Sequence, residues 1–382
     1  MIKEQKYCAA PWRSLHLNFE GQIKTCCAGD LKMLGKNHNG TIESILQSPL
    51  LTEIKQSIQN GILHPTYCRG CIDREDAGGQ SERDWHNNIS KPFDVKTANL
   101  DNHAPNLIDV RWNNTCNLAC TYCDSYFSTK WASIKGDITN NEQNHTIKHQ
   151  YQQLIDYIEK HNTHVKEVAM VGGEPLMMKE NNLLLDVLPD DVLITVISNM
   201  TPDFDKFPVP NKLLSRKRVG WSMSFDNIGK RFEYVRWGST WEQLDKNVTT
   251  VANKINNSQQ HGGIHAVYNI YNCTQLCELK QYALDKGINI LWQQVSGDHF
   301  DPALHNVKVR KLAINEIQKY RDMFEISDSD KNFLDSTENN LQRGTTDNSK
   351  EFLKFTEKLE NYWHPDQQDK FLELWPDIAE AL

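Results

Sequence analysis

The chain lacks any long apolar run and any basic stretch. None of its 382 residues lies in a segment approaching the roughly 20 apolar residues of a membrane span. The formal net charge is -8 without a cluster of Lys and Arg, which disfavours a protein that binds nucleic acid by neutralising phosphates. Met1–Lys6 also lacks the apolar core of a secretory signal. We therefore expect a cytoplasmic protein that has neither a membrane nor nucleic acid as its partner.

The composition is that of a globular protein with room for more than one unit. Hydrophobic residues make up 38% of the chain and charged residues 24%. A polar stretch over His86–Asn106 predicts a linker. Towards the C-terminus, apolar periodicity predicts helices over Lys308–Phe324, Asn348–Trp363 and Gln367–Leu382, with an acidic, Ser/Thr/Asn-rich loop around Ser327–Asn348. The aromatic residues Tyr362, Trp363 and Trp375 in this tail are expected to pack against the rest of the protein.

Six short runs have the composition of buried strands. They are Leu107–Trp112, Val165–Val171, Val192–Ser198, Arg218–Phe225, Ile264–Tyr271 and Ile288–Val295. Helical periodicity fills the gaps between them, as in Trp241–Ile255, which starts with the capping-box pattern Ser239-Thr240-Trp241-Glu242. Another helix is predicted over Thr274–Lys286, with Gly287 at its C-terminal cap. Alternating strands and helices predict an α/β fold with a parallel sheet and right-handed crossovers.

Three closely spaced cysteines, Cys116, Cys120 and Cys123, follow the first of these strands. Three thiolates on one loop can hold three corners of an iron-sulfur cube, which leaves the fourth iron without a protein ligand. An iron with an open position can bind and activate a small molecule, whereas a fully ligated cluster carries electrons or holds structure. The triplet therefore indicates a cluster that takes part in a chemical reaction.

The spacing resembles the radical S-adenosylmethionine (SAM) family, whose C-x3-C-x2-C loop leaves one iron for the amino and carboxylate groups of SAM. Tyr122 stands where that family has an aromatic residue near the adenine. In α/β barrels the site forms at the carboxyl ends of the strands. After the second strand, Gly172-Gly173-Glu174 is similar to the family's GGE motif, which receives the SAM amino group. Ser198-Asn199 closes the third strand, where the family contacts the ribose.

The fourth strand ends in Ser222-Met223-Ser224-Phe225-Asp226, and Arg236 follows. This arrangement resembles the peptide-modifying branch of the family and implies that Ser224, Asp226 and Arg236 help to bind SAM. Arg236 could pair bidentately with the SAM carboxylate. Singly, each feature also has an ordinary structural explanation, since Gly172-Gly173 could be a turn, Asp226 a helix cap and Arg236 a surface charge. The order of the motifs along the chain favours cofactor binding.

The resemblance also implies an architecture and a reaction. The expected fold is a partial (β/α)6 TIM-type barrel over residues 105–300, after a linker over 86–104 and before a C-terminal helical extension over 301–382. A 4Fe-4S cluster on the cysteine triplet would cleave SAM reductively to a 5'-deoxyadenosyl radical, which abstracts a substrate hydrogen. A flavodoxin- or ferredoxin-type protein would be the electron donor.

A second group of cysteines precedes the predicted barrel. This group consists of Cys8, Cys26, Cys68 and Cys71, with Gly21 between the first two. Its spacing is similar to that of the twitch module, a short SPASM-like domain that binds an auxiliary 4Fe-4S cluster. Tyr7–Trp12 and Asp73–Arg83, with Gly78-Gly79 and Ser81, fit the same module, which we place at residues 1–85. Four cysteines would complete the coordination of that cluster, which could accept an electron from the substrate. Zinc, disulfides or a purely structural iron cluster are the alternatives.

Three cysteines remain outside these two groups, and we expect Cys27, Cys273 and Cys277 to be packed thiols. The resemblance implies oxidation or cross-linking of a peptide or protein. The alternatives are a radical dehydrogenase acting on a small molecule such as a sugar or nucleotide, and a non-catalytic metal-binding or electron-transfer protein. Candidate substrate-facing residues, each of which could instead pack or cap a loop, are Tyr268, Tyr271, Asn272, Gln293 and Gln294.

Overall fold

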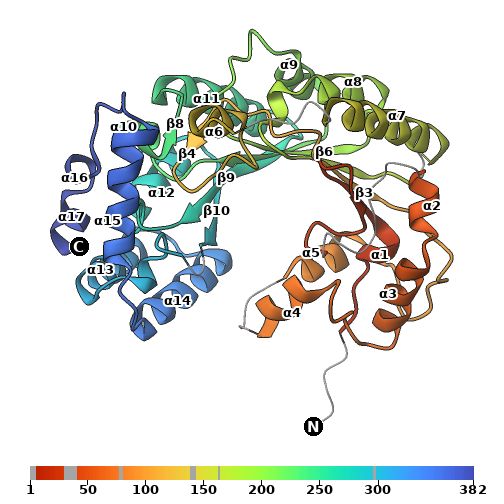
Figure 1. Cartoon of the computed structure of the whole chain (residues 1–382), viewed down its shortest axis with the longest axis horizontal. Coiled ribbons are helices and arrows are strands. Elements are labelled where there is room, and N and C mark those ends of the chain that lie inside the picture. The colour runs from red at the N-terminus through yellow and green to blue at the C-terminus, as the bar shows by residue number, and fades with distance from the viewer. Residues whose placement is uncertain (1–5, 30–40, 77–80, 138–142, 162–163, 296–297) are drawn as a thin grey trace. The chain divides into compact units, whose positions relative to one another are not determined.

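The computed structural model describes residues 6–29, 41–76, 81–137, 143–161, 164–295 and 298–382 (Figure 1). Most of Met1–Lys6, and Gly78-Gly79 of the predicted module, lie outside these ranges. The chain forms two compact units, of which the first comprises residues 1–114 and 140–196 and the second comprises 115–139 and 197–382. Both units combine helices with mostly parallel strands. The predicted α/β class is therefore confirmed.

Within its described residues, the first unit contains five strands in the order β2-β1-β3-β5-β6. They are β1 (Ser14–Leu17), β2 (Ile23–Lys24), β3 (Leu107–Val110), β5 (Glu167–Met170) and β6 (Leu193–Ser198), whose last two residues belong to the second unit. β1 and β2 are antiparallel, and the other pairs are parallel. Leu15, Ile108, Val168 and Ile194 stand opposite one another in this register, and all four are fully buried. This apolar row holds the strands together.

The second unit contains a parallel sheet and a short antiparallel ribbon. In the sheet, β9 (His261–Tyr268) lies between β7 (Val219–Ser224) and β10 (Asn289–Gln294). The ribbon pairs β4 (Ala119–Cys120) with β8 (Arg236–Trp237). Alternate residues of β9 differ in burial, because Ile264, Ala266 and Tyr268 are buried whereas His265 and Val267 are partly exposed. The sheet therefore has one apolar face and one mixed face.

Helices flank the strands of each unit (Figure 1). Those of the first unit are α1 (Ala10–Arg13), α2 (Ile42–Leu46), α3 (Pro49–Gln59), α4 (Arg69–Asp76), α5 (Glu82–Ile89), α7 (Gln143–His161), the 3-10 turn η1 (Pro175–Met177) and α8 (Lys179–Val187). Those of the second unit, up to residue 304, are α6 (Thr129–Lys135), α9 (Pro208–Ser215), α10 (Gly229–Val235), α11 (Trp241–Asn256), α12 (Leu276–Asp285) and the 3-10 turn η2 (Pro302–Leu304).

The six predicted strands are present as β3, β5, β6, β7, β9 and β10. Gly287 has φ 65° directly after α12, which confirms its capping position. The predicted capping box of α11 was one residue early, because Thr240 rather than Ser239 is the N-cap, and its hydroxyl accepts the Gln243 N–H at 3.3 Å. α5 extends into the stretch predicted as a linker, with Ser81 as its N-cap.

The C-terminal segment is more helical than the sequence predicted. It contains α13 (Val307–Met323), α14 (Asp328–Arg343), α15 (Ser349–Lys358), the π-turn η3 (Leu359–Trp363), α16 (Phe371–Leu374) and α17 (Pro376–Ala381). The predicted acidic loop around Ser327–Asn348 is wrong, since most of it forms α14. Ser327 caps this helix, and a sparse stripe of Phe333, Leu334 and Leu341 is buried. The polar composition of its other face concealed the helix.

The aromatic residues of this segment differ in their environments. Trp375 is fully buried, and its indole N–H donates to the backbone oxygen of Tyr271 at 2.7 Å, as expected of a packing residue. Trp363 packs edge-on against Trp131. The prediction for Tyr362 is wrong, because 75% of this residue is exposed. Within the described residues, no helix is both long enough and apolar enough to cross a membrane.

Candidate functional site

The ribbon formed by β4 and β8 fixes the loop that carries the cysteine triplet. Cys120 stands directly opposite Arg236 in its register. The loop is held further by the Thr121 N–H, which donates to the Val235 oxygen at 2.8 Å, and by the Trp131 indole N–H, which donates to the Cys120 oxygen at 2.9 Å. Gly238 has φ 119°, and a Cβ there would lie 2.7 Å from the backbone oxygen of Asn117. Only glycine permits this close approach.

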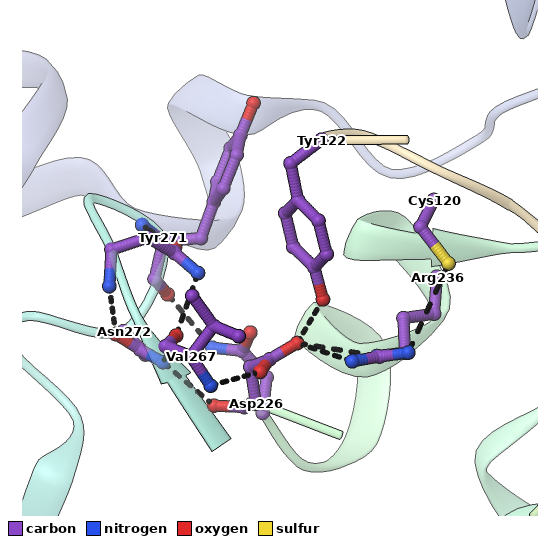
Figure 2. A network of polar contacts seen from close by, with 9 residues as sticks. Cys120, Tyr122, Asp226, Arg236, Val267, Tyr271 and Asn272 are labelled. Carbon is purple, nitrogen blue, oxygen red and sulfur yellow. Dashed lines mark hydrogen bonds and ion pairs between the residues drawn. The ribbon is translucent and has the colours of Figure 1, made fainter. Parts of the chain in front are cut away.

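Asp226 is the centre of a buried polar network (Figure 2). Its Oδ2 accepts hydrogen bonds from Nε and Nη2 of Arg236 at 3.2 and 3.0 Å, and from the hydroxyl of Tyr122. Its Oδ1 accepts the Val267 N–H at 2.7 Å. Asn272 extends the network by donating to the backbone oxygens of Val267 and Asp226 at 2.9 and 3.3 Å. The carboxylate thus joins the cysteine loop, the segment after α10 and the end of β9.

Arg236 uses its third nitrogen differently. Nη1 lies 4.0 Å from the Sγ of Cys120, while the guanidinium carbon lies 5.6 Å from the centre of the Tyr122 ring. Burial alone would lower the pKa of Arg236, but the charge of Asp226 raises it above its ordinary value. Burial raises the pKa of Cys120 to about 12, and Arg236 is the strongest influence in the opposite direction. The guanidinium therefore favours the thiolate form of Cys120.

A second donor approaches Cys116. Nδ2 of Asn199 lies 3.7 Å from the Cys116 Sγ and 3.1 Å from Oδ1 of Asn117. Oδ1 of Asn199 accepts the N–H and the hydroxyl of Thr201, at 2.9 and 2.7 Å. The Asn199 amide is therefore held by contacts at both ends, with its N–H groups directed at the cysteine loop.

The turn after β6, which carries Asn199, is held by several hydrogen bonds. The hydroxyl of Ser198, a predicted ribose contact, accepts the Met200 N–H at 2.9 Å. Met200 is fully buried and has φ 60°, a left-handed conformation that a side chain adopts at a cost of about 1–3 kcal/mol. Asn247 stabilises this turn by donating to the Met200 oxygen at 2.8 Å. Ser224, the remaining predicted residue of this unit, is half-buried opposite His265.

The three thiols of the loop influence one another. Burial raises the pKa of Cys123 to about 11, and Cys116 raises it further, while Cys123 in turn raises that of Cys120. Such mutual repulsion of thiolates is relieved by a bound cation or cluster, and thiolate sulfur is the ligand that iron-sulfur clusters take. Within the part of the chain that is described, no group of three or more His, Cys, Asp or Glu side chains is arranged to hold a metal ion as it stands.

Gly172, Gly173 and Glu174 belong to the first unit and are considered by themselves. Gly172 has φ 117°, and a Cβ there would lie 3.1 Å from the backbone oxygen of Asn113, which also accepts the Gly173 N–H at 3.2 Å. Glu174 is fully buried, and its carboxylate accepts the Leu176 N–H at 3.0 Å as the N-cap of η1. The two glycines therefore form a close-packed turn against the segment after β3.

The four predicted ligands of the N-terminal group line one cavity, together with Tyr67 and Arg83. Cys8 precedes α1 and Cys26 follows β2, while Cys68 directly precedes α4 and Cys71 lies within it. Burial raises the pKa of Cys8 to about 12, and Cys68 and Cys71 add to this effect. Three buried thiols and the half-buried Cys68 would repel one another as thiolates and suit a cationic metal centre, so the residues present fit the implied cluster.

The three remaining cysteines differ in their surroundings. Cys27 is half-buried, shares a hydrogen bond with Cys26, and lines a neighbouring cavity of about 340 Å³ with Cys71, Arg111 and Glu82. Cys273 and Cys277 are buried, with their sulfurs 3.5 and 4.0 Å from the backbone oxygens of Ile270 and Glu316. Their prediction as packed thiols is confirmed.

The candidate substrate-facing residues divide into two groups. Tyr268, Tyr271 and Asn272 are buried and serve packing or loop closure. Gln293 is exposed and Gln294 half-buried; Gln293 lies 3.0 Å from Nε2 of His265, whose Nδ1 lies 3.3 Å from the Ser222 hydroxyl. The sequence analysis missed His265, although strict alternation in β9 separates it from the apolar residues on either side.

No protein family model and no curated protein matches the chain. Among solved structures, it is similar to SuiB from Streptococcus suis, with a TM-score of 0.38 and 15% identity over 57% of this chain and 47% of SuiB. A structure of anSMEcpe with bound AdoMet gives a TM-score of 0.40 and 15% identity over 58% and 62% of the two chains. SuiB bound to the precursor peptide SuiA gives 0.39 and 12% over 71% and 63%. The chain therefore spans less than two thirds of the length of each of these proteins.

Proposed function

We propose that the chain is a radical SAM enzyme whose cysteine triplet binds a 4Fe-4S cluster with one open iron. The observation that carries this proposal is the geometry of the loop. Cys116 raises the pKa of Cys123, Cys123 raises that of Cys120, and N–H groups of Asn199 and Arg236 face the sulfurs of Cys116 and Cys120. Hydrogen bonds to ligand sulfurs are a general feature of iron-sulfur sites.

When bound, the cluster and SAM would supply reductive cleavage of the sulfonium and a radical able to abstract hydrogen from an unreactive carbon. The protein's own residues bind, orient and shield. On the family resemblance alone, we propose Tyr122, Ser224 and the Gly172-Gly173-Glu174 turn as SAM-binding residues. The other residues predicted for this site make many hydrogen bonds within the protein, which favours a role in holding the site rigid. They are Ser198, Asn199, Asp226 and Arg236.

We further propose that the N-terminal cavity holds an auxiliary 4Fe-4S cluster on Cys8, Cys26, Cys68 and Cys71. All four side chains line the same cavity, which supports this ligand set. Full cysteine coordination would make this centre an electron carrier and leave substrate activation to the triplet. Zinc remains the rival metal for four thiols.

For the substrate, we propose a peptide or protein. This choice is supported by the run Ser222–Asp226 and Arg236, which resembles the peptide-modifying branch. The linked side chains of Ser222, His265 and Gln293 offer polar contacts on the mixed face of the sheet, as a peptide backbone requires. The outcome would be oxidation or cross-linking, with an electron supplied by a flavodoxin- or ferredoxin-type donor.

Anaerobic reconstitution tests the proposal. We expect about eight irons per chain and deoxyadenosine formation that depends on SAM and a reductant. Cys120→Ala should lose deoxyadenosine formation, whereas Cys277→Ala, which removes a buried cysteine outside both groups, should retain it. Zinc in place of iron, without SAM binding, would instead support a non-catalytic metal-binding protein.

A further inference from the structure

We infer that Arg236 is a positioning residue that raises the reduction potential of the cluster on Cys116, Cys120 and Cys123, by directing its Nη1 at the Cys120 sulfur. This inference rests on the proposed function, because it presupposes that cluster. It gives Arg236 a role different from the binding of the SAM carboxylate that the sequence suggested.

The pairing of β4 with β8 sets the distance between Nη1 of Arg236 and the Cys120 sulfur. Cys120 and Arg236 face each other in the two-residue ribbon of β4 and β8, and side chains at directly opposed positions project from the same face. Nη1 consequently lies 4.0 Å from the Cys120 Sγ (Figure 2). The Thr121 N–H, bonded to the Val235 oxygen at 2.8 Å, prevents the two strands from sliding.

Asp226 fixes the direction of the guanidinium. Nε and Nη2 both donate to its Oδ2, so the remaining edge of the planar group points to the sulfur. Arg236 and Asp226 have side chains that are 8% and 0% exposed, and Asp226 is itself held by Tyr122 and the Val267 N–H. To bind a cofactor carboxylate with its Nε edge, Arg236 would first have to break its buried ion pair with Asp226.

The direction in which Arg236 shifts the reduction potential of the cluster follows from its charge. Reduction adds one negative charge to a cluster, and a cationic N–H donor beside a ligand sulfur stabilises the reduced form. Asp226 opposes this effect, but it lies behind the guanidinium as seen from Cys120. The ion pair therefore presents its positive end to the sulfur.

Redox titration of the reconstituted full-length protein, followed by electron paramagnetic resonance, tests the inference. The cluster of interest is identified as the one whose signal changes on adding SAM, and its midpoint potential is then measured without SAM. We expect a shift to a more negative potential in Arg236→Gln and a smaller shift in Arg236→Lys, which keeps the charge but loses the planar fork. Arg231→Gln is the matched control, because Arg231 lies in α10 and pairs with Glu278 rather than with a residue of the cysteine triplet.

The outcomes separate the inference from the proposed function. An unchanged potential in Arg236→Gln, with SAM cleavage intact in the wild type, overturns the inference alone. Absence of the cluster or of SAM cleavage in the wild type overturns both. If Arg236→Gln does not fold, wild-type protein labelled with 15N-arginine gives a second readout. We expect hyperfine coupling between an arginine nitrogen and the SAM-responsive cluster before SAM is added, and its absence overturns the inference.

Discussion

The two cysteine groups of this chain differ in what surrounds the sulfurs. In the first unit, four thiols line a cavity with the aromatic ring of Tyr67, and Arg83 is the single cation among the described residues that line it. In the second unit, three thiols sit on a loop whose neighbours direct N–H groups at the sulfurs of Cys116 and Cys120. Four ligands complete a cluster and suit electron transfer, whereas three ligands with polar neighbours suit the binding of a further molecule.

The largest expected effect comes from removing a ligand of the second unit. Cys120→Ala should reduce SAM-dependent deoxyadenosine to background and lower the iron content from about eight to about four per chain. The reason is that an iron cube with two protein ligands in this loop is not retained. Liquid chromatography of the products and a colorimetric iron assay measure both quantities. Retained SAM cleavage in this variant would contradict the proposed site.

Removing a ligand of the first unit should have the opposite effect on the two cysteine groups. We expect Cys8→Ser to lose about half of the iron and to keep deoxyadenosine formation, because the SAM site lies on the other cysteines. Turnover of the peptide substrate should fall, since the electron acceptor is missing. Cys273→Ser is the matched control and should retain both clusters, because Cys273 is buried with its sulfur 3.5 Å from the backbone oxygen of Ile270 and belongs to neither ligand group. Equal loss of iron in both variants would argue against the assigned ligands.

The ion pair of the second unit should matter for folding as well as for the cluster. Asp226→Asn leaves Arg236 buried without its counter-charge, and breaking such a pair costs about 3–5 kcal/mol. Asp205→Asn should cost about 0–1 kcal/mol, because Asp205 is 84% exposed in its pair with Lys246. Urea unfolding of the two variants measures the difference. Equal stabilities would mean that the network around Asp226 contributes little.

The smallest effect concerns pH and the first unit. Burial alone would raise the pKa of Glu75, but hydrogen bonds from Arg83, Lys6 and Ser81 lower it to about 2 from 4.5. Its stabilisation is therefore present above the unfolded value and is lost as the pH falls through the folded value. We expect Glu75→Gln to be less stable than wild type at pH 7, with the difference disappearing as the pH approaches 2. A constant difference across this range, measured by urea unfolding, would exclude this origin.

Sequence and structure agree where a local pattern carries the information. Periodicity located the six strands from β3 to β10 in the parallel sheet but not β1, and cysteine spacing selected the four thiols that line the N-terminal cavity. The pattern failed for α14, where few apolar residues mark the buried stripe. It also could not show that Arg236 faces Cys120, because this contact depends on the pairing of two strands of two residues each, 116 positions apart in the chain. Long-range register of such short strands leaves no periodicity in the sequence.

The open iron of the second unit is tested most directly by electron paramagnetic resonance on the reduced, reconstituted protein with and without SAM. We predict two 4Fe-4S signals, of which one changes on adding SAM and disappears in Cys120→Ala, with deoxyadenosine as the product. Signals that do not respond to SAM, or a protein that takes up no iron on the cysteine triplet, would contradict the proposed chemistry.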